Sequence, residues 1–509
     1  MTTTSKLLAS GALLRVLVLF SSIVSAFFLM PFIIHSIGER WYGLWIIIGT
    51  LMGYYGLLDF GLTNASQRFT ARALHTQEPD DIHYAVSTSI GIFSAIGAIA
   101  IIISGIIMAI APVFFASDED ITIFRTVIAI MGAKVAISFP FVSFFGIITA
   151  KLRYDIVSYA TLFKIILRFI LFYTYISHGY SIIALAWITL ITELLGYFIT
   201  AYYALKLVPE LKIHYQFFNP ALLKEYYNYG KFAFLSSIGN VLRFQIDDLV
   251  IAKFLSLAIV THYTVAIRLI EYAGQFMVSI LGIFNPVFTK YHTTGDYKAI
   301  REKFLFIIQV SAMLSFLLGG TILILGENFI LLWMGDKFLD AYIPLIILAI
   351  GSIVAQSSSP CVSILYAINK HKYYAYMTLI EAFLNLTLSI ILIQYLGMLG
   401  VALGTMLPLI ITKIYFQPRY TCRQISLQYS KYYYNLIKFI LYSTPLFLCF
   451  YYLNHLFPAN NYLLLFIYGG IFSIIYILYS LKFIFTKDSK EIISTIVPVR
   501  FNKFYNFFT

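Results

Sequence analysis

The feature that most constrains this chain is a series of long apolar segments, each long enough to cross a lipid bilayer. The segments run for about 20 to 27 residues, and a helix needs about 20 residues to span about 30 Å of hydrocarbon. Only 11% of the residues are charged, whereas a soluble domain carries about 25%. A β-barrel would instead show short segments of alternating hydrophobicity. The sequence therefore predicts an all-α polytopic membrane protein.

We expect about fourteen transmembrane helices, some of them joined by junctions as short as HGYS at residues 178–181. Because no small-residue cleavage site follows the polar MTTTSK start, we expect the first helix to be retained rather than removed as a signal peptide. The expected helices cover residues 13–36, 41–64, 85–111, 121–149, 155–178, 181–207, 229–254, 262–289, 303–326, 341–366, 372–396, 398–418, 432–455 and 461–484.

The basic residues of the predicted loops indicate the orientation, because short loops rich in Lys and Arg stay in the cytoplasm. With the N-terminus inside, most of these residues, including Lys151 and Lys413, fall on the cytoplasmic side. The outer loops hold only Arg40, Lys253 and Lys337. Both termini are therefore predicted to be cytoplasmic. The net charge of +12 is predicted to face anionic membrane lipids rather than nucleic acid.

The sequence also contains an internal repeat. The stretch AKLRYDIVSYATL from Ala150 aligns with AINKHKYYAYMTL from Ala367, and GYSIIALA from Gly179 resembles GMLGVALG from Gly397. Upstream of both, AIMGAKVAISFP parallels AIGSIVAQSSSP. A six-helix unit therefore is predicted to occur twice in the same membrane orientation, followed by two further helices.

This repeat divides the chain into an N-lobe at 1–212, a C-lobe at 213–423, and a last helix pair with a cytoplasmic tail at 424–509. Transporters of this build place the substrate between their two lobes and rock one lobe against the other. We therefore expect the two lobes to surround a central cavity.

Charged residues inside the predicted helices are candidate site residues, because such residues usually face a bundle interior or a water-filled cavity. Lys164 and Arg168 are four residues apart and share a helix face. Two like charges at mid-membrane favour an anionic ligand, and ammonium and guanidinium groups are what a pyrophosphate requires. The interior charges of the first half are Arg15, Lys134, Lys164, Arg168, Asp59 and Glu193.

Two of these residues lie near the cytoplasmic side, so we expect Arg15 and Asp59 to pair. Arg15 alone has a second interpretation, in which its side chain simply reaches the inner headgroups.

The second half carries more acidic than basic residues inside its predicted helices. Arg243 and Asp247 share one helix face, and Arg268 and Glu271 share another. Asp247 is either the internal partner of Arg243 or one of several carboxylates that carry a coupling proton or sodium ion. The interior charges of this half are Arg243, Arg268, Asp247, Asp248, Glu271 and Glu381.

The motifs of common enzyme classes are missing from the sequence. It has no Walker A, HExxH or GxSxG motif, and its nine histidines form no pair with metal-ligand spacing. The three cysteines form no CxxC pair. We expect neither an enzyme nor a bound metal or cofactor.

The segment LMPFIIHSIGERWYGLWIIIGTLMGYYGLLDFGLTNASQRFTAR, at 29–72, resembles the first helical hairpin of polysaccharide transporters. These are the Wzx-type O-antigen and exopolysaccharide flippases of the multidrug/oligosaccharidyl-lipid/polysaccharide flippase superfamily. The resemblance rests on the IG-E-YGLW turn at 37–45, on LLDFGL at 57–62, and on the basic residues Arg68 and Arg72.

The resemblance implies a flippase of the bacterial cytoplasmic (inner) membrane that acts in lipopolysaccharide or exopolysaccharide biosynthesis. Its expected substrate is an undecaprenyl-pyrophosphate-linked oligosaccharide, moved to the outer leaflet by alternating access and driven by a proton or sodium gradient. A polysaccharide polymerase and a chain-length regulator are implied partners. The alternatives are a cation-coupled multidrug exporter of the same superfamily and a lipid-II-type flippase.

The resemblance assigns two sets of residues. The basic residues Arg15, Lys134, Lys164 and Arg168 would hold the pyrophosphate, with Arg243 and Arg268 as further cavity residues. Asp59 would fix Arg15 or gate the inner mouth.

Overall fold

The structure is a computed structural model that describes residues 3–74, 76, 80–115 and 117–496. The description leaves out the side chains of residues 3–13, 114, 228–233, 235, 236, 240, 242–244, 371, 495 and 496. Helices are the only regular structure in the described ranges, and 13 of them are long and apolar enough to cross a membrane. The prediction of an all-α polytopic membrane protein is confirmed.

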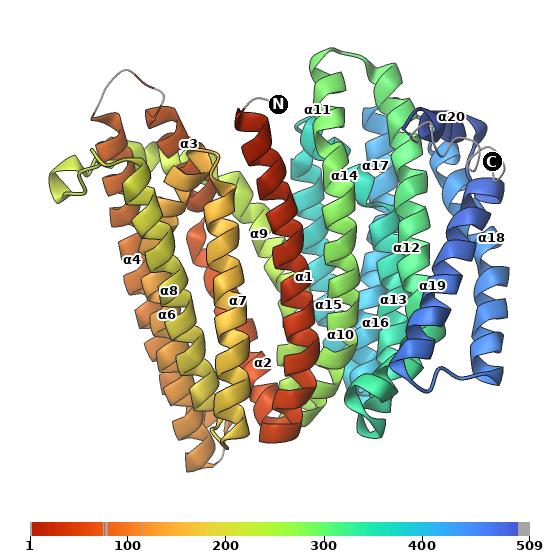
Figure 1. The fold of residues 1–509 in the computed structure, drawn as a ribbon, viewed down its shortest axis with the longest axis horizontal. Coiled ribbons are helices and arrows are strands. Elements are labelled where there is room, and N and C mark those ends of the chain that lie inside the picture. The colour runs from red at the N-terminus through yellow and green to blue at the C-terminus, as the bar shows by residue number, and fades with distance from the viewer. Residues whose placement is uncertain (1–2, 75, 77–79, 116, 497–509) are drawn as a thin grey trace. The chain divides into compact units, whose positions relative to one another are not determined.

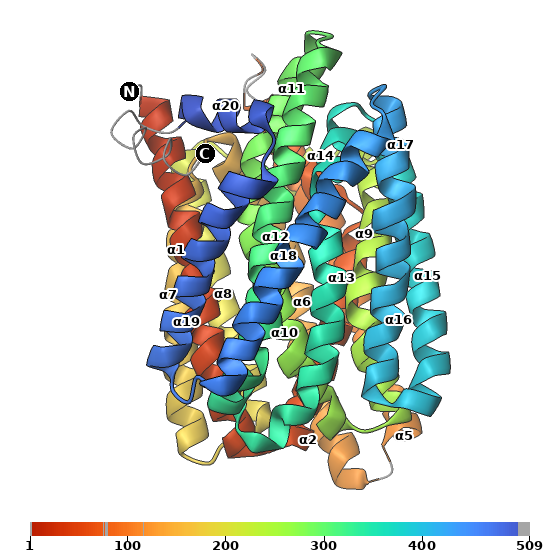
Figure 2. The ribbon, with the colours of Figure 1, turned by 90° about the vertical axis from the view of Figure 1, so that its right-hand side faces the viewer.

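The chain forms two compact units. The first consists of Met1–Val241 with Ser256–Thr261, and the second of Leu242–Leu255 with His262–Thr509. The helix α9 (Pro220–Phe254) contributes to both units and covers the expected seventh span. Figures 1 and 2 show the helices of each unit running side by side.

The remaining helices follow in chain order. The first unit contains α1 (Thr3–Ile37), α2 (Glu39–Tyr54), η1 (Tyr55–Asp59), α3 (Leu62–Ala73), α4 (Asp81–Ala109), α5 (Ala111–Phe114), α6 (Asp118–Ala150), α7 (Tyr154–Ser177), α8 (Ile182–Leu207) and η2 (Tyr215–Phe217). After α9 come α10 (Leu257–Leu281), η3 (Gly282–Phe284), α11 (Asn285–Thr293), α12 (Tyr297–Met334), η4 (Asp336–Ala341), α13 (Tyr342–Ser357), α14 (Ser359–Ala367), α15 (His371–Leu396), α16 (Met398–Ile410), η5 (Ile411–Phe416), α17 (Gln417–Gln424), α18 (Tyr429–Leu456), α19 (Tyr462–Tyr479), η6 (Ser480–Ile484) and α20 (Lys487–Ile496).

The second expected span, 41–64, is not one helix, and this part of the prediction is wrong. The chain leaves helical geometry after η1, where Phe60 and Gly61 adopt left-handed backbone angles with φ of 48° and 73°. Gly61 tolerates this conformation because it has no Cβ. The carboxylate of Asp59 then accepts hydrogen bonds from the backbone N–H of Thr63, at 3.0 Å, and from the Thr63 hydroxyl. Asp59 therefore satisfies a donor that the start of α3 would otherwise leave unpaired.

The internal repeat is visible in the local backbone of both units. The helices α6 and α14 end at equivalent positions of the repeat, where Leu152 and Asn369 have left-handed φ angles of 57° and 55°. In each case the N–H of the next residue, Arg153 or Lys370, donates to the carbonyl five residues earlier, at 3.0 and 2.8 Å. Both ends are thus Schellman motifs, which turn the chain into the next helix.

Small residues allow close packing of helices within each unit. In the first unit, a Cβ added to Gly97 of α4 would lie 2.5 Å from the carbonyl oxygen of Ala136 on α6. In the second, a Cβ added to Gly404 of α16 would lie 2.3 Å from the hydroxyl of Ser389 on α15. Such contacts hold membrane helices together without a hydrophobic driving force between them. One contact holds α4 against α6, which carries Lys134, and the other holds α16 against α15, which carries Glu381.

Candidate substrate-binding site

The hairpin of α7 and α8 brings three charged side chains of the first unit together. The Lys164 Nζ lies 2.7 Å from one carboxylate oxygen of Glu193, and an Arg168 terminal nitrogen lies 2.8 Å from the other. The Nε of Arg168 also donates to the hydroxyl of Thr192, at 3.1 Å. Lys164 and Arg168 share a face of α7, as predicted. Glu193 on the next helix is their common partner.

Lys134 completes this arrangement, which we call the basic cluster (Lys134, Lys164, Arg168 and Glu193), and Tyr197 lies beside it. Lys134 on α6 interacts electrostatically with the other three residues. Tyr197, one turn after Glu193 on α8, interacts electrostatically with Glu193. The cluster therefore has three basic side chains and one carboxylate, and it joins α6, α7 and α8.

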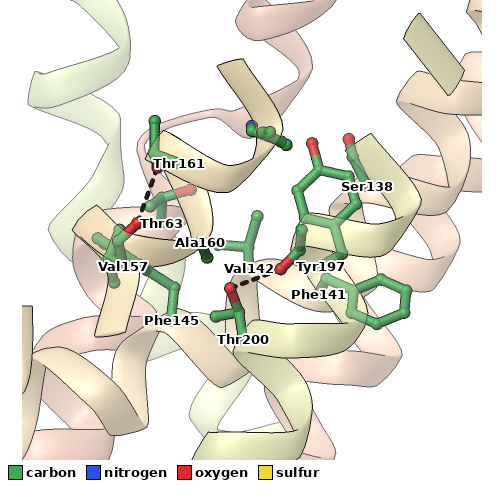
Figure 3. A pocket seen from close by; sticks show the side chains of 12 residues that line it. Thr63, Ser138, Phe141, Val142, Phe145, Val157, Ala160, Thr161, Tyr197 and Thr200 are labelled. Carbon is green, nitrogen blue, oxygen red and sulfur yellow. Dashed lines mark hydrogen bonds between the residues drawn. The ribbon is translucent and has the colours of Figure 1, made fainter. Parts of the chain in front are cut away.

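A cavity of about 250 Å³ opens beside the basic cluster. Figure 3 shows Ser138, Phe141 and Tyr197 along one side of it, with Thr63, Val157 and Thr161 on the other. Lys164 and Thr200 also line it, so an ammonium group and several hydroxyls face the same space. The side chains of Lys164, Arg168 and Glu193 are 21%, 28% and 13% exposed, respectively. The cluster is therefore partly open rather than sealed.

These contacts correct one part of the sequence interpretation. Lys164 and Arg168 were expected to form a basic face that favoured an anionic ligand. Glu193 instead neutralises part of their charge, because the turn between α7 and α8 places it opposite both residues. An excess of positive charge remains, since Lys134 and one of the two paired cations have no acidic counterpart in the cluster.

The expected pair of Arg15 and Asp59 is not formed, and this prediction is wrong. The guanidinium of Arg15 lies over the ring of Tyr154, 4.4 Å from its centre, and the Arg15 side chain is exposed. Asp59 instead bonds to Thr63, because the break after η1 points its carboxylate along α3. Thr63 itself lines the cavity. A gating role for Asp59 remains a prediction.

The second unit contains a buried carboxylate with two hydroxyl partners. The Oδ2 of Asp247 on α9 accepts hydrogen bonds from the Tyr263 hydroxyl, at 2.8 Å, and from the Thr405 hydroxyl, at 2.6 Å. Asp247 is 6% exposed, and its Oδ1 has no hydrogen-bond partner among the described residues. The neighbouring Asp248 is half-buried and adds a second negative charge nearby.

The predicted pairings of the two arginines in this unit differ in outcome. Arg268 and Glu271 of α10 form the predicted ion pair, with a nitrogen–oxygen distance of 2.6 Å, and both side chains are about one third exposed. The side chain of Arg243 lies outside the described residues, so its suggested pairing with Asp247 stays a prediction.

Glu381 has a partner that the sequence interpretation placed in a cytoplasmic loop. Lys413, in the π-helical segment η5, has its Nζ 3.5 Å from Glu381 on α15, and the two side chains are only 5% and 2% exposed. The Thr412 hydroxyl donates to Glu381 at 2.7 Å, and the Lys413 Nζ donates to Gln417 at 2.9 Å. The assignment of Lys413 to a loop is therefore wrong. We call Glu381 and Lys413 the sealed pair.

The internal repeat contained a signal for Lys413. Glu381 is the counterpart of Lys164 with reversed sign, and Lys164 and Glu193 are 29 residues apart. Thr412 lies 31 residues after Glu381, and Lys413 follows it directly. An opposite charge at a similar distance after Glu381 would therefore have identified Lys413. The sequence contains no comparable signal for Tyr197, because its place in the cavity wall is visible only in the structure.

Comparison with known proteins supports this architecture. A family model described as "Polysaccharide biosynthesis protein" matches residues 68–343. The uncharacterized membrane protein EpsK of Bacillus subtilis (strain 168) is 22% identical over 414 residues, which cover 79% of this chain and 80% of EpsK. The probable low-salt glycan biosynthesis flippase Agl15 of Haloferax volcanii is 29% identical over 182 residues, 36% of this chain and 38% of Agl15.

Among solved structures, the lipid II flippase MurJ in its inward closed conformation is similar, with a TM-score of 0.70 and 16% identity. The match covers 91% of this chain and 97% of MurJ, and at this identity it shows the fold alone. The chain therefore belongs to the polysaccharide biosynthesis protein family, and its fold is that of MurJ.

Proposed function

We propose that the chain moves an oligosaccharide repeat unit linked to undecaprenyl pyrophosphate from the cytoplasmic to the outer leaflet of a bacterial inner membrane. The movement takes place by alternating access. The observation that carries the proposal is the basic cluster, which lies within membrane helices and beside a cavity. The family assignment supports a substrate used in polysaccharide biosynthesis.

The chemistry of the cluster suits a diphosphate headgroup. An arginine forms paired hydrogen bonds with phosphate oxygens, and a lysine acts as a compact point charge on them. In a medium of low dielectric constant these interactions are much stronger than in water. A drug-like multidrug substrate is often cationic, and the positive charge of the cluster would repel it.

The size of the cavity limits what it receives in this conformation. A drug-sized ligand occupies a pocket of about 300–1,000 Å³, and the cavity beside Lys164 measures about 250 Å³. It has room for the two phosphates and a few waters but not for an oligosaccharide. On this proposal the sugars lie outside the cavity, and the lipid tail stays in the bilayer.

Ion coupling is assigned to the second unit. Asp247 is a buried carboxylate held by two hydroxyl donors, and one of its oxygens has no hydrogen-bond partner among the described residues. We propose that it carries the coupling proton or sodium ion. A polymerase and a chain-length regulator would then act on the delivered product.

The proposal is tested by surface polysaccharide in a deletion strain that carries variants of the chain. Lys164→Ala with Arg168→Ala should abolish surface polysaccharide, with protein level and membrane insertion unchanged. The matched control is Arg125→Ala with Lys206→Ala, which removes two exposed basic residues of the same unit outside the cluster. Normal surface polysaccharide in the Lys164/Arg168 variant would overturn the proposal.

A further inference from the structure

Glu193 stands where an anionic ligand of the basic cluster would have to bind. Its two carboxylate oxygens take one hydrogen bond each, from Lys164 at 2.7 Å and from Arg168 at 2.8 Å. A phosphate group that bridges two such donors places its oxygens at similar distances. The carboxylate therefore competes with the headgroup for these two side chains.

The phosphate and the carboxylate compete for these two cations. Two negative groups a few ångströms apart repel each other, and a partly buried site screens this repulsion less than bulk water does. Lys134 is the third cation of the cluster. It interacts with Glu193 through its charge and donates no hydrogen bond to it among the described residues. Binding of the phosphate therefore favours release of the carboxylate.

Tyr197 offers a hydroxyl donor to the displaced carboxylate. It interacts electrostatically with Glu193, and it lines the cavity together with Ser138. A side-chain rotation of Glu193 toward Tyr197 would keep one hydrogen bond on the carboxylate while it frees Lys164 and Arg168. Tyr197, Ser138 and Lys164 all line the cavity, so the exchange takes place at its wall.

We propose that Glu193 is an intramolecular competitor of the substrate, which the diphosphate displaces on binding and which expels the diphosphate when it returns to Lys164 and Arg168. This inference rests on the proposed function and names the residue that regulates its site. Glu193 is thus a positioning residue that sets the affinity of the cluster. It makes the site weak enough to release its ligand.

The test uses the purified full-length chain in detergent and farnesyl diphosphate, a soluble prenyl diphosphate, as the probe. Glu193→Gln keeps the shape of the side chain and removes its charge, so the probe should bind at least tenfold more tightly than to the wild-type chain. Glu193→Asp keeps the charge but is too short to reach both cations, so it should bind with intermediate affinity. In the deletion strain, Glu193→Gln should lower surface polysaccharide although its binding is tighter, because release becomes slow.

The outcomes separate this inference from the proposed function. If Glu193→Gln and Glu193→Asp bind the probe no more tightly than wild type, while Lys164→Ala with Arg168→Ala loses binding, the competitor role is wrong and the site remains. If Glu193→Gln does not fold, Glu193→Asp decides alone. If the wild-type chain does not bind the probe, or the Lys164/Arg168 variant binds it unchanged, the proposed function itself is contradicted. A purely structural role of Glu193 predicts weaker binding in both Glu193 variants.

Discussion

The α7–α8 hairpin of the first unit and the segment from α15 to η5 in the second carry the same kind of ion pair with the charges exchanged. In the first, the cations Lys164 and Arg168 come before the acid Glu193. In the second, the acid Glu381 comes before the cation Lys413. The first set is 13–28% exposed and borders a cavity, whereas the second is 2–5% exposed. The two halves of the repeat thus carry an open cluster in one unit and a sealed pair in the other.

This difference separates a binding role from a structural role. A buried ion pair contributes little net stability compared with well-packed apolar residues, but removal of one partner leaves an uncompensated buried charge. A partly open cluster loses less stability when it is altered, because water can reach the remaining charge. We therefore expect changes to the sealed pair to affect folding and changes to the basic cluster to affect transport.

The largest effect on stability is expected from Lys413→Ala. This variant leaves Glu381 charged at a buried position, which should cost about 3–5 kcal/mol of folding stability. Thermal unfolding of the detergent-solubilised chain, followed by fluorescence-detected size-exclusion chromatography, measures the loss. A melting temperature equal to wild type would show that the pair is not sealed.

The largest effect on transport at nearly constant stability is expected when the charges of Lys164, Arg168 and Glu193 are removed and Lys134 is left unchanged. Lys164→Met, Arg168→Met and Glu193→Leu together remove the cations and their acid, so no unpaired charge remains among the three. Surface polysaccharide should be lost, while the melting temperature falls by only a few degrees. Retention of surface polysaccharide would place the substrate site elsewhere.

A smaller effect is expected from Asp59→Ala, which sharpens the comparison within the first unit. Loss of the hydrogen bonds to Thr63 should cost about 0.5–2 kcal/mol, as for other residues that cap a helix start. Asp59→Asn keeps an oxygen acceptor and serves as the matched control, with a smaller cost. If both variants transport normally at wild-type protein levels, Asp59 has no gating role.

The smallest effect is expected from the combined change Glu381→Leu and Lys413→Met. Apolar side chains of similar size replace both charges, so stability should change by less than about 1.5 kcal/mol. Surface polysaccharide should stay at the wild-type level, in contrast to its loss in the variant that changes Lys164, Arg168 and Glu193. A loss of surface polysaccharide in a stable variant would give the sealed pair a transport role.

Much of the fold was predictable because each membrane-spanning helix corresponds to an apolar segment of characteristic length in the sequence. The break after η1 was not predictable in this way, because Phe60 and Gly61 are compatible with a continuous apolar helix and only the local backbone shows their left-handed angles. The Schellman ends at Leu152 and Asn369 agree with the sequence repeat, although neither residue is a glycine.

The candidate site was predictable only in part. Helical spacing placed Lys164 and Arg168 on one face, but spacing within one helix says nothing about a partner on the next, so Glu193 was not paired with them. Lys413 was misplaced because a basic residue near the end of an apolar segment usually marks the cytoplasmic edge. Its burial depends on the π-helical segment η5, which shifts the register of side chains around Glu381.

The central claim, that the first unit's cluster is open to water and the second unit's pair is not, is tested most directly by thiol accessibility. Thr161→Cys places a thiol on the cavity wall, and Thr412→Cys places one beside Glu381. Both are made in a Cys449→Ser background, because Cys449 is exposed and the other two native cysteines are buried. A small, water-soluble methanethiosulfonate should label Thr161→Cys rapidly and Thr412→Cys only after unfolding. Equal labelling rates at the two positions would contradict the account.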